Sequence, residues 1–268
     1  MYIAIIVIVL IFGLYLLAVR GRVGNKDLSK IRGFDYDHRG LHGNGACENS
    51  LTAFRLAKEN GYGVELDVHL LKDGNLAVIH DSDLTRITGK SGKIEDLQTA
   101  DLKNYYLSNT GDTIPLFEDA LKLFNGAVPL IVELKAVNGN HKMLCEKANA
   151  LLENYNGVYC VESFDPRCVY WFKKNKPEIL RGQLAENFLK RKVKVNVIIR
   201  FLMTNNLLNF LTKPDFVAYR FEDRKNLSNK ICQKLWKMQM VTWTVRTIED
   251  HNNIKAKNWL SIFEYFIP

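Results

Sequence analysis

Charged side chains stand two residues apart in two β-type segments of this chain. One segment pairs two carboxylates, and the other pairs a carboxylate with a lysine. Glu65 and Asp67 lie in the segment 63–70, and Glu133 lies in the segment 129–135. Side chains two residues apart point to the same face of a strand, and carboxylates on a buried face are costly unless they are paired or bind a cation. Three such groups offer the oxygen ligands that Mg²⁺ and Ca²⁺ prefer. The pattern predicts one divalent cation, Mg²⁺ or Ca²⁺, held by Glu65, Asp67 and Glu133.

Two histidines, an arginine and a lysine stand at the ends of β-type segments. His38 and Arg39 close the segment 34–40, His80 closes 75–80, and Lys135 closes 129–135. Arginine and lysine bind phosphate oxygens, and histidine titrates near neutral pH, which suits a general acid or base. An isolated E-x-D is more typical of an exposed strand face, and an isolated histidine of a structural residue. Their coincidence at successive strand ends favours a site that cleaves a phosphoester.

The elements that would position these residues alternate between β-type and amphipathic segments. The β-type segments cover 34–40, 63–70, 75–80, 129–135, 158–164, 178–184, 215–220, 240–246 and 259–266. Helices are predicted over 50–59, 117–125, 141–153, 166–175, 199–212, 227–238 and 248–255. The short segment 75–80 closely follows the one before it, and the other eight alternate with helices. This order predicts an α/β fold, the (β/α)8 TIM barrel, whose chemistry collects at the carboxyl ends of its strands. A doubly wound sheet is the alternative, although no glycine-rich phosphate loop follows any strand.

The composition is that of a folded chain rather than a disordered or fibrous one. The 268 residues are 47% apolar and 25% charged, which suits one large domain. The five cysteines are widely spaced and form no C-x-x-C pair, so neither a disulfide framework nor a zinc site is predicted. The net charge of +8 suits a nucleic acid, a membrane surface or an anionic substrate. Scattered basic runs such as 173–176 lack interleaved aromatics, so no nucleic-acid partner is predicted.

The basic residues are concentrated after an apolar N-terminus. Residues 1–19 carry no charged side chain, a length that suits a membrane-spanning helix. The basic residues that follow, against the single acid Asp27, are Arg20, Arg22, Lys26, Lys30 and Arg32. We predict a transmembrane anchor over 1–20, a basic juxtamembrane linker over 21–33 and a catalytic domain over 34–268. The positive-inside rule places that domain of a single-pass membrane protein in the cytoplasm. A cleaved signal peptide and a buried core helix are the alternatives.

Ten short motifs follow one another from residue 38 onward. They are His38-Arg39-Gly40, Glu48-Asn49-Ser50, Glu65-Leu66-Asp67-Val68, Lys72-Asp73-Gly74, His80-Asp81, Thr88-Gly89, Ile114-Pro115, Glu133-Leu134-Lys135, Ser163-Phe164 and Trp243-Thr244-Val245. Together they resemble the glycerophosphodiester phosphodiesterase family, and the resemblance covers the chain from about Tyr36 to its end. It implies a TIM barrel that uses a divalent metal to cleave glycerophosphodiesters to glycerol 3-phosphate and an alcohol, in phospholipid and glycerol metabolism.

The resemblance also implies roles for the matching residues. The three carboxylates would hold the metal, while His38 and His80 would be the acid and base, one activating the attacking hydroxyl and the other protonating the leaving alcohol. The residues implied to line the phosphate and the substrate are Arg39, Glu48, Lys135 and Trp243. Trp243 would form an apolar wall against the glycerol. His69 is expected to lie outside the ligand set.

Four positions depart from the family pattern. Cys47 and Leu71 stand where Pro and Thr are usual, Arg246 stands where Asn is usual, and Glu264 lies near the usual Thr-Asp. The last two bear on the alcohol or lipid accepted. A lysophospholipid substrate is therefore an alternative, as is another lipid phosphodiester. A barrel that binds a lipid or polyanion without cleaving it is a further alternative.

The end of the predicted barrel raises a separate question. No helix follows the last predicted strand, so the N-terminal segment or an oligomer partner is expected to cover the last seam, unless that seam is exposed. The oligomeric state is left open.

Overall fold

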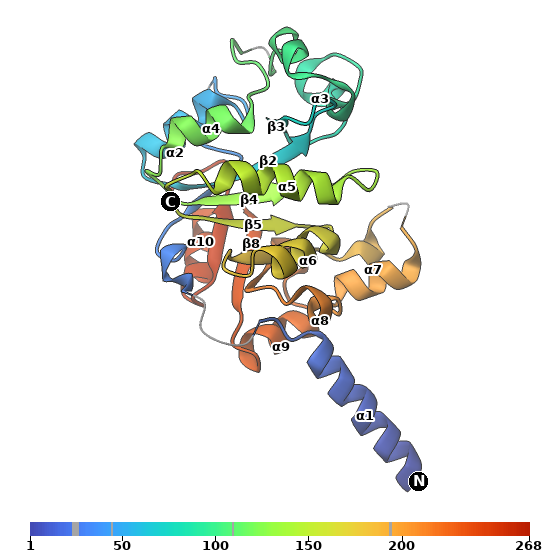
Figure 1. Ribbon diagram of the computed structural model, residues 1–268. Helices are drawn as coiled ribbons and strands as arrows, with labels where there is room; N and C mark the ends of the chain where they lie inside the picture. The colour runs from blue at the N-terminus through green and yellow to red at the C-terminus, as the bar shows by residue number, and fades with distance from the viewer. Residues whose placement is uncertain (23–26, 44, 109, 193–194) are drawn as a thin grey trace.

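The barrel predicted from the sequence is confirmed in the computed structural model, which describes residues 1–22, 27–43, 45–108, 110–192 and 195–268. The strands of these residues are β1 (Tyr36–His38), β2 (Gly63–Leu70), β3 (Leu76–Val78), β4 (Leu130–Leu134), β5 (Tyr159–Ser163), β6 (Arg181–Ala185), β7 (Phe216–Arg220), β8 (Gln239–Val245) and β9 (Leu260–Phe263). All except β3 pair in parallel, and β1 pairs with both β2 and β9, which closes the ring (Figure 1). Strand β3 pairs antiparallel with β2.

The helices of the described residues are α1 (Tyr2–Ala18), α2 (Leu51–Glu59), α3 (Thr85–Thr88), α4 (Phe117–Phe124), α5 (His141–Leu152), α6 (Pro166–Asn175), α7 (Val197–Thr204), α8 (Asn209–Thr212), α9 (Leu227–Lys234) and α10 (Ile248–Lys255). Most of them lie on the outside of the barrel, whereas α1 projects away from it (Figure 1). Short 3-10 turns lie at η1 (Leu28–Lys30), η2 (Ile94–Asp96), η3 (Thr99–Asn104), η4 (Phe188–Lys190) and η5 (Phe221–Asp223).

The single helix predicted over 199–212 is wrong, because the structure divides this segment into α7 and α8. Asn206, between them, has a φ of +54°, a left-handed conformation that a right-handed helix cannot include. Its buried side-chain amide donates a hydrogen bond of 2.8 Å to the Asn229 side chain. That tertiary contact stabilises the break.

The N-terminal helix is shorter than the predicted anchor. Helix α1 has 17 residues, whereas about 20 are needed to cross the hydrocarbon core. No helix of the described residues is long and apolar enough to span a membrane. The transmembrane helix predicted over 1–20 is therefore not supported by the structure.

The C-terminal end of α1 is attached to the barrel domain. Val19 is fully buried, the Tyr15 hydroxyl lies 2.7 Å from that of Ser228, and the Trp236 indole donates to the Leu16 carbonyl at 2.9 Å. Within the predicted linker, Arg22 forms an ion pair of 3.3 Å with Asp215. Residues 23–26 of that linker, Lys26 included, lie outside the described residues. The boundary at residues 33 and 34 stays a prediction.

The seam between β9 and β1 is covered by this chain itself. Phe263 of β9 is fully buried, and its ring packs against Tyr62 at 5.1 Å, Phe266 at 5.4 Å and His251 at 6.3 Å between centroids. The N-terminal segment covers a different place, since Ile31 packs among the residues inside the barrel. No partner is needed to cover Phe263.

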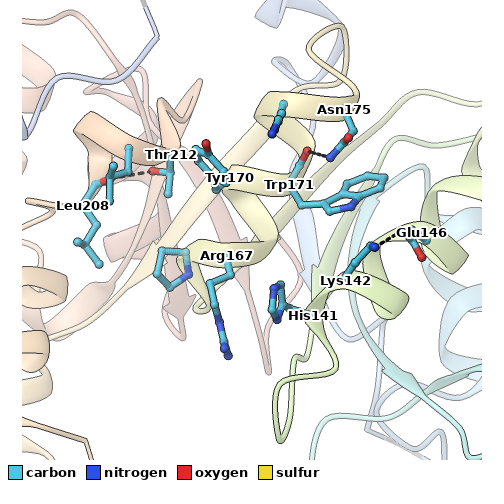
Figure 2. A pocket seen from close by; sticks show the side chains of 12 residues that line it. His141, Lys142, Glu146, Arg167, Tyr170, Trp171, Asn175, Leu208 and Thr212 are labelled. Atoms are coloured by element: carbon cyan, nitrogen blue, oxygen red, sulfur yellow. Dashed lines mark hydrogen bonds and ion pairs between the residues drawn. The ribbon is translucent and has the colours of Figure 1, made fainter.

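A hollow of about 740 Å³ lies among α5, α6 and α8 (Figure 2). Tyr170 and Trp171 of α6 line it together with Leu208 beside α8. None of the residues that line this hollow is a predicted site residue.

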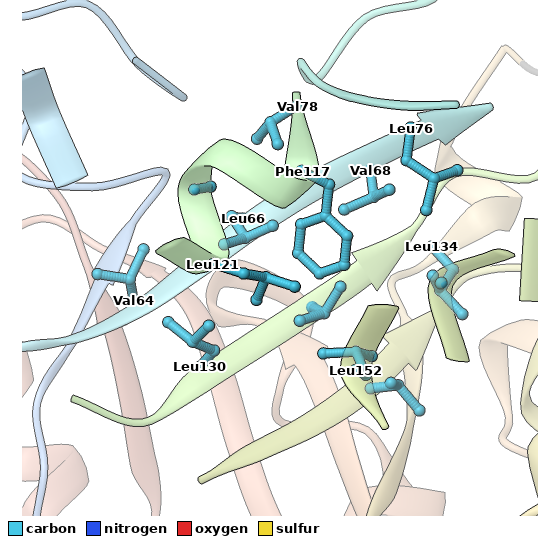
Figure 3. Packing of buried hydrophobic residues seen from close by; sticks show 14 of the residues in the cluster. Val64, Leu66, Val68, Leu76, Val78, Phe117, Leu121, Leu130, Leu134 and Leu152 are labelled. Atoms are coloured by element: carbon cyan, nitrogen blue, oxygen red, sulfur yellow. The ribbon is translucent and has the colours of Figure 1, made fainter. Parts of the chain in front are cut away.

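Apolar residues packed between the strands and the outer helices determine which residues face the barrel interior. Alternate residues of β2 (Val64, Leu66 and Val68) pack outward with β4 against α4, whose Phe117 and Leu121 lie in the same cluster (Figure 3). Successive side chains of a strand point to opposite faces. Burial of the apolar series against the helices therefore turns the intervening residues of β2, Glu65 and Asp67 among them, toward the interior.

We expect Phe117→Ala to lower the free energy of unfolding by about 3–5 kcal/mol, because it removes a fully buried ring. Urea denaturation followed by circular dichroism measures this loss. Phe210→Ala is the matched control, since Phe210 is half exposed. Equal effects of the two substitutions would contradict this account of the core.

Candidate active site

The three predicted carboxylates meet inside the barrel. One ligand oxygen from each of Glu65, Asp67 and Glu133 lies within 4.8 Å of the others, and all three side chains are buried. Asp67 is directly opposite Glu133 in the parallel pairing of β2 with β4. The register of this strand pair brings together carboxylates that are 66 positions apart in the chain.

The charge of this carboxylate cluster is only partly balanced by the protein. Lys135 Nζ lies 2.9 Å from Asp67 Oδ1 and 2.8 Å from Glu133 Oε1, and Arg39 Nε lies 3.2 Å from Asp67 Oδ2. Burial by itself raises the pKa of Asp67, but these cations, with His80, hold it well below its ordinary value. Asp67 is therefore ionised at neutral pH.

Glu65 and Glu133 are less well compensated. Burial, and then the charges of neighbouring carboxylates, raises the pKa of Glu65 well above its ordinary value, and burial raises the pKa of Glu133 to about 7. Glu65 Oε2 is buried and has no hydrogen-bond partner among the described residues. An all-oxygen cluster with surplus negative charge and an unpartnered oxygen fits a hard divalent cation. Glu65, Asp67 and Glu133 are the residues that would hold it.

His38 lies at the end of β1 and is buried. Burial, and then the charge of Arg39, lowers the pKa of His38 to about 4, so its imidazole is neutral at pH 7 and able to accept a proton. Arg39 itself has a φ of +60°, and its guanidinium donates to Glu48 at 2.8 Å. Glu48 also pairs with Arg86 at 2.7 Å, so its carboxylate fixes the two arginines.

His80 is oriented by two neighbours. Its Nδ1 lies 2.7 Å from Asp81 Oδ1, and because a carboxylate only accepts, Nδ1 carries the proton. Its carbonyl accepts a hydrogen bond of 3.1 Å from His69 Nε2. His69 Nδ1 is bound in turn to Glu95 at 2.7 Å. His69 thus lies outside the carboxylate cluster, as expected.

A cavity of about 380 Å³ opens over these groups. Its lining includes His38, His80, Glu65 and Glu133. The apolar part of its wall includes Trp243 and Phe164, whose rings meet edge to face at 5.5 Å between centroids. The two histidines therefore face one cavity, beside the carboxylates and against an aromatic wall.

Residues 38–259 match the model of the glycerophosphoryl diester phosphodiesterase family. The chain belongs to this family. A glycerophosphodiester phosphodiesterase from Bacillus altitudinis is 34% identical over 155 residues, which are 54% of this chain and 63% of that protein. A human lysophospholipase D is 30% identical over 132 residues, 44% of this chain and 40% of that protein. The matched region spans less than two thirds of either relative.

Solved structures of the family share the barrel. An Oleispira antarctica phosphodiesterase, in complex with the product sn-glycerol-3-phosphate, has a TM-score of 0.71 at 21% identity, over 86% of this chain and 92% of that one. A Thermotoga maritima glycerophosphodiester phosphodiesterase has a TM-score of 0.64 at 23% identity, over 87% and 95%. Likeness at these identities establishes the fold.

Two positions that depart from the family pattern contact one another. Arg246 Nε donates to Glu264 Oε2 at 3.0 Å, and Glu264 Oε1 lies 3.3 Å from both His38 Nδ1 and His42 Nε2. Burial by itself raises the pKa of Glu264, but the bonded histidines and Arg246 hold it well below its ordinary value. An ionised Glu264 accepts from Nδ1 of His38 and leaves Nε2 as the proton acceptor.

Two further polar residues belong to the site and were not predicted from the sequence. Glu162 of β5 is opposite Glu133 in the strand pairing and lines the cavity. The alternation of inward and outward side chains along the strand could have identified it. Asn49 donates from its side-chain amide to Asp67 Oδ2 at 2.8 Å. Asn49 belongs to a recognised motif, but its partner is 18 positions away and is decided by the fold.

A divalent cation is expected to stabilise the folded chain through the carboxylate cluster. At 100 times its dissociation constant, a bound ligand adds about 2.7 kcal/mol, which for this size raises the unfolding midpoint by roughly 5–10 °C. Differential scanning fluorimetry with Mg²⁺ or Ca²⁺ measures the rise. Glu65→Gln should abolish it, whereas Glu118→Gln on the exposed face of α4 should not. An undiminished rise in Glu65→Gln would remove Glu65 from the site.

Proposed function

We propose that this chain hydrolyses glycerophosphodiesters to glycerol 3-phosphate and an alcohol, using one divalent cation. The observation that carries the proposal is the buried cluster of Glu65, Asp67 and Glu133 at the floor of a cavity that two histidines also face. Membership of the family supports the same chemistry. A barrel that only binds a lipid has no need of either histidine, so hydrolysis is the better account.

The protein groups can perform both proton transfers of the reaction. His38, neutral at pH 7, accepts a proton from the hydroxyl of the attacking water molecule as the water oxygen bonds to phosphorus. Burial lowers the pKa of His80, and the negative charge of a bound phosphodiester raises that pKa again. In the resulting imidazolium, Asp81 holds Nδ1–H, and Nε2–H donates its proton to the alcohol oxygen as the bond between that oxygen and phosphorus breaks. Arg39 lies beside the cluster, where its charge attracts phosphate oxygens. The bound cation would supply further positive charge for those oxygens.

The shape of the cavity suits a glycerol group beside the reacting centre. Trp243 and Phe164 offer apolar faces that pack against the carbon side of glycerol. The alcohol end faces Arg246, Glu222 and Arg220, which line the outer part. Mg²⁺ and Ca²⁺ both suit carboxylate ligands, and we propose one of them as the cofactor, with the reaction in phospholipid and glycerol metabolism.

A lysophospholipid is the second candidate substrate. Exposed apolar side chains lie beside the cavity mouth, where Leu189 follows Phe188, and Phe188 packs against Phe164 at 5.9 Å between ring centroids. An acyl chain could lie along such a surface.

The charge asymmetry of the sequence predicts that the catalytic domain lies on the cytoplasmic side of a membrane. This location stays a prediction.

Glycerol 3-phosphate release from glycerophosphocholine and glycerophosphoglycerol by the full chain tests the main proposal. We expect release that EDTA abolishes and Mg²⁺ or Ca²⁺ restores. His38→Ala and His80→Ala should each lower kcat by roughly 10²–10⁴, the usual contribution of a general acid or base. His141→Ala, outside the site on α5, is the control.

The same assay with lysophosphatidylcholine distinguishes the second candidate through choline release. Hydrolysis of the lysolipid alone would replace the first substrate class with the second. Full activity in both active-site histidine variants would overturn the proposed chemistry.

Glu264→Gln should lower kcat for the same reaction by about 10–100-fold, the usual cost of losing a partner that orients a reacting side chain. KM should change little, because Glu264 does not itself line the cavity and acts through His38. Glu264→Asp should recover part of the rate. A Glu264→Gln enzyme with unchanged kcat would show that His38 is positioned without it.

A further inference from the structure

Helix α7 lies beside the mouth of the barrel. It follows β6, and Figure 1 shows it on the side toward which the arrows of β4 and β5 point. The Arg200 guanidinium of α7 donates to the carbonyls of Phe188, Leu189 and Arg191 at 2.8–3.0 Å. Phe188 packs against Phe164, which lines the active-site cavity. These contacts attach α7 to the rim of the cavity.

The side chains that α7 turns to solvent are apolar. Val197, Ile198 and Phe201 are 61%, 64% and 50% exposed, and Leu189 of the adjoining η4 is 43% exposed. The one charged residue of α7, Arg200, is bound to the backbone around η4. A helix that is apolar nearly all round is ordinarily covered. We call the surface of Leu189, Val197, Ile198 and Phe201 the rim surface.

Basic residues outnumber acidic ones around the rim surface, where Lys190 pairs with Asp223 at 3.2 Å and Arg191 pairs with Glu186 at 2.7 Å. In the sequence, residues 187–214 include six lysines and arginines and no aspartate or glutamate. Lys192, near the rim surface, is exposed. Apolar side chains flanked by basic ones are typical of helices that lie in the surface of an anionic membrane. The charge therefore favours anionic lipid as the partner.

Helix α1 joins the same part of the molecule. The Asn209 side chain of α8 donates to the Val19 carbonyl at 3.0 Å, and Leu207 packs with Tyr15 and Val19. Figure 1 shows α8 between α1 and α7. Apart from its last turn, the side chains of α1 are apolar and mostly exposed. Two exposed apolar helices attached to one short segment suit a lipid surface that meets both.

We propose that the rim surface rests in the headgroup region of an anionic lipid membrane, with Ile198 and Phe201 among the acyl chains and Lys192 among the headgroups. The cavity mouth then opens at the membrane, where lipid-derived phosphodiesters enter. The benefit of this placement rests on the proposed function, but the membrane contact itself is testable without catalysis.

The test places an environment-sensitive fluorophore on the full chain at Ile198→Cys. The five native cysteines are buried, so the new thiol is the accessible one. Vesicles of equal parts phosphatidylcholine and phosphatidylglycerol should shift the emission to the blue, and phosphatidylcholine vesicles should shift it less. The same label at Met143→Cys on α5, where the native side chain is 52% exposed, should not respond. Because the label reports its own surroundings, membrane binding by α1 alone cannot produce the signal at position 198.

A second variant pair tests the energetic contribution. Ile198→Glu should weaken vesicle binding roughly tenfold, a loss of about 1.4 kcal/mol, and should leave hydrolysis of soluble glycerophosphocholine unchanged. Met143→Glu should alter neither. A label at 198 that behaves as the label at 143, or an Ile198→Glu chain that binds vesicles as the parent does, would overturn the proposal. Absence of hydrolysis in the parent would overturn the proposed function and leave the fluorescence result intact.

Discussion

Lys135 stands between Asp67 and Glu133 within 3 Å of both, and its charge is what allows carboxylates to be buried together inside the barrel. One ammonium group and the nearby Arg39 do not neutralise Glu65 as well, and burial, together with the charges of neighbouring carboxylates, raises the pKa values of Glu65 and Glu133. The desolvation cost of buried like charges is otherwise prohibitive. The site therefore suits the binding of one further positive charge.

That constraint extends outward through pairs of opposite charge. Arg39 is held by Glu48, Glu48 by Arg86, and Arg86 by Asp81, which also binds His80. A single connected network thus fixes Arg39, the proposed phosphate-binding cation, and His80, the proposed proton donor. Glu264 and Arg246 form a similar support for His38. Each reacting group is held by a partner whose charge also adjusts its protonation.

The helices around the mouth serve a different purpose from those around the outer core. Helix α4 buries its apolar face against β2 and β4, as a helix of a barrel ordinarily does. Helix α7 instead exposes apolar residues next to the cavity and uses Arg200 to stay attached to the rim. The free energy that α7 would gain by burial is still available for a partner.

Much of the site and the fold followed from local pattern. Strand alternation predicted that Glu65 and Asp67 share a face, and the order of strands and helices predicted a barrel, because both depend on periodicities of two and 3.6 residues that are visible in the chain. Three features depended on contacts between distant segments. The break between α7 and α8 depends on Asn206 meeting Asn229, the support of His38 depends on the pairing of β1 with β9, and the attachment of α1 depends on α8 and α9.

The sequence by itself determined the chemistry: which residue types are present, which face of a strand they share, and that their buried charge requires a cation. Only the tertiary structure decided their partners. The closure of the barrel brings Glu264 to His38 across 226 positions, and local periodicity carries no information about such a separation. A pattern specifies the direction of a side chain, whereas its electrostatic environment is the sum of everything the fold packs around it.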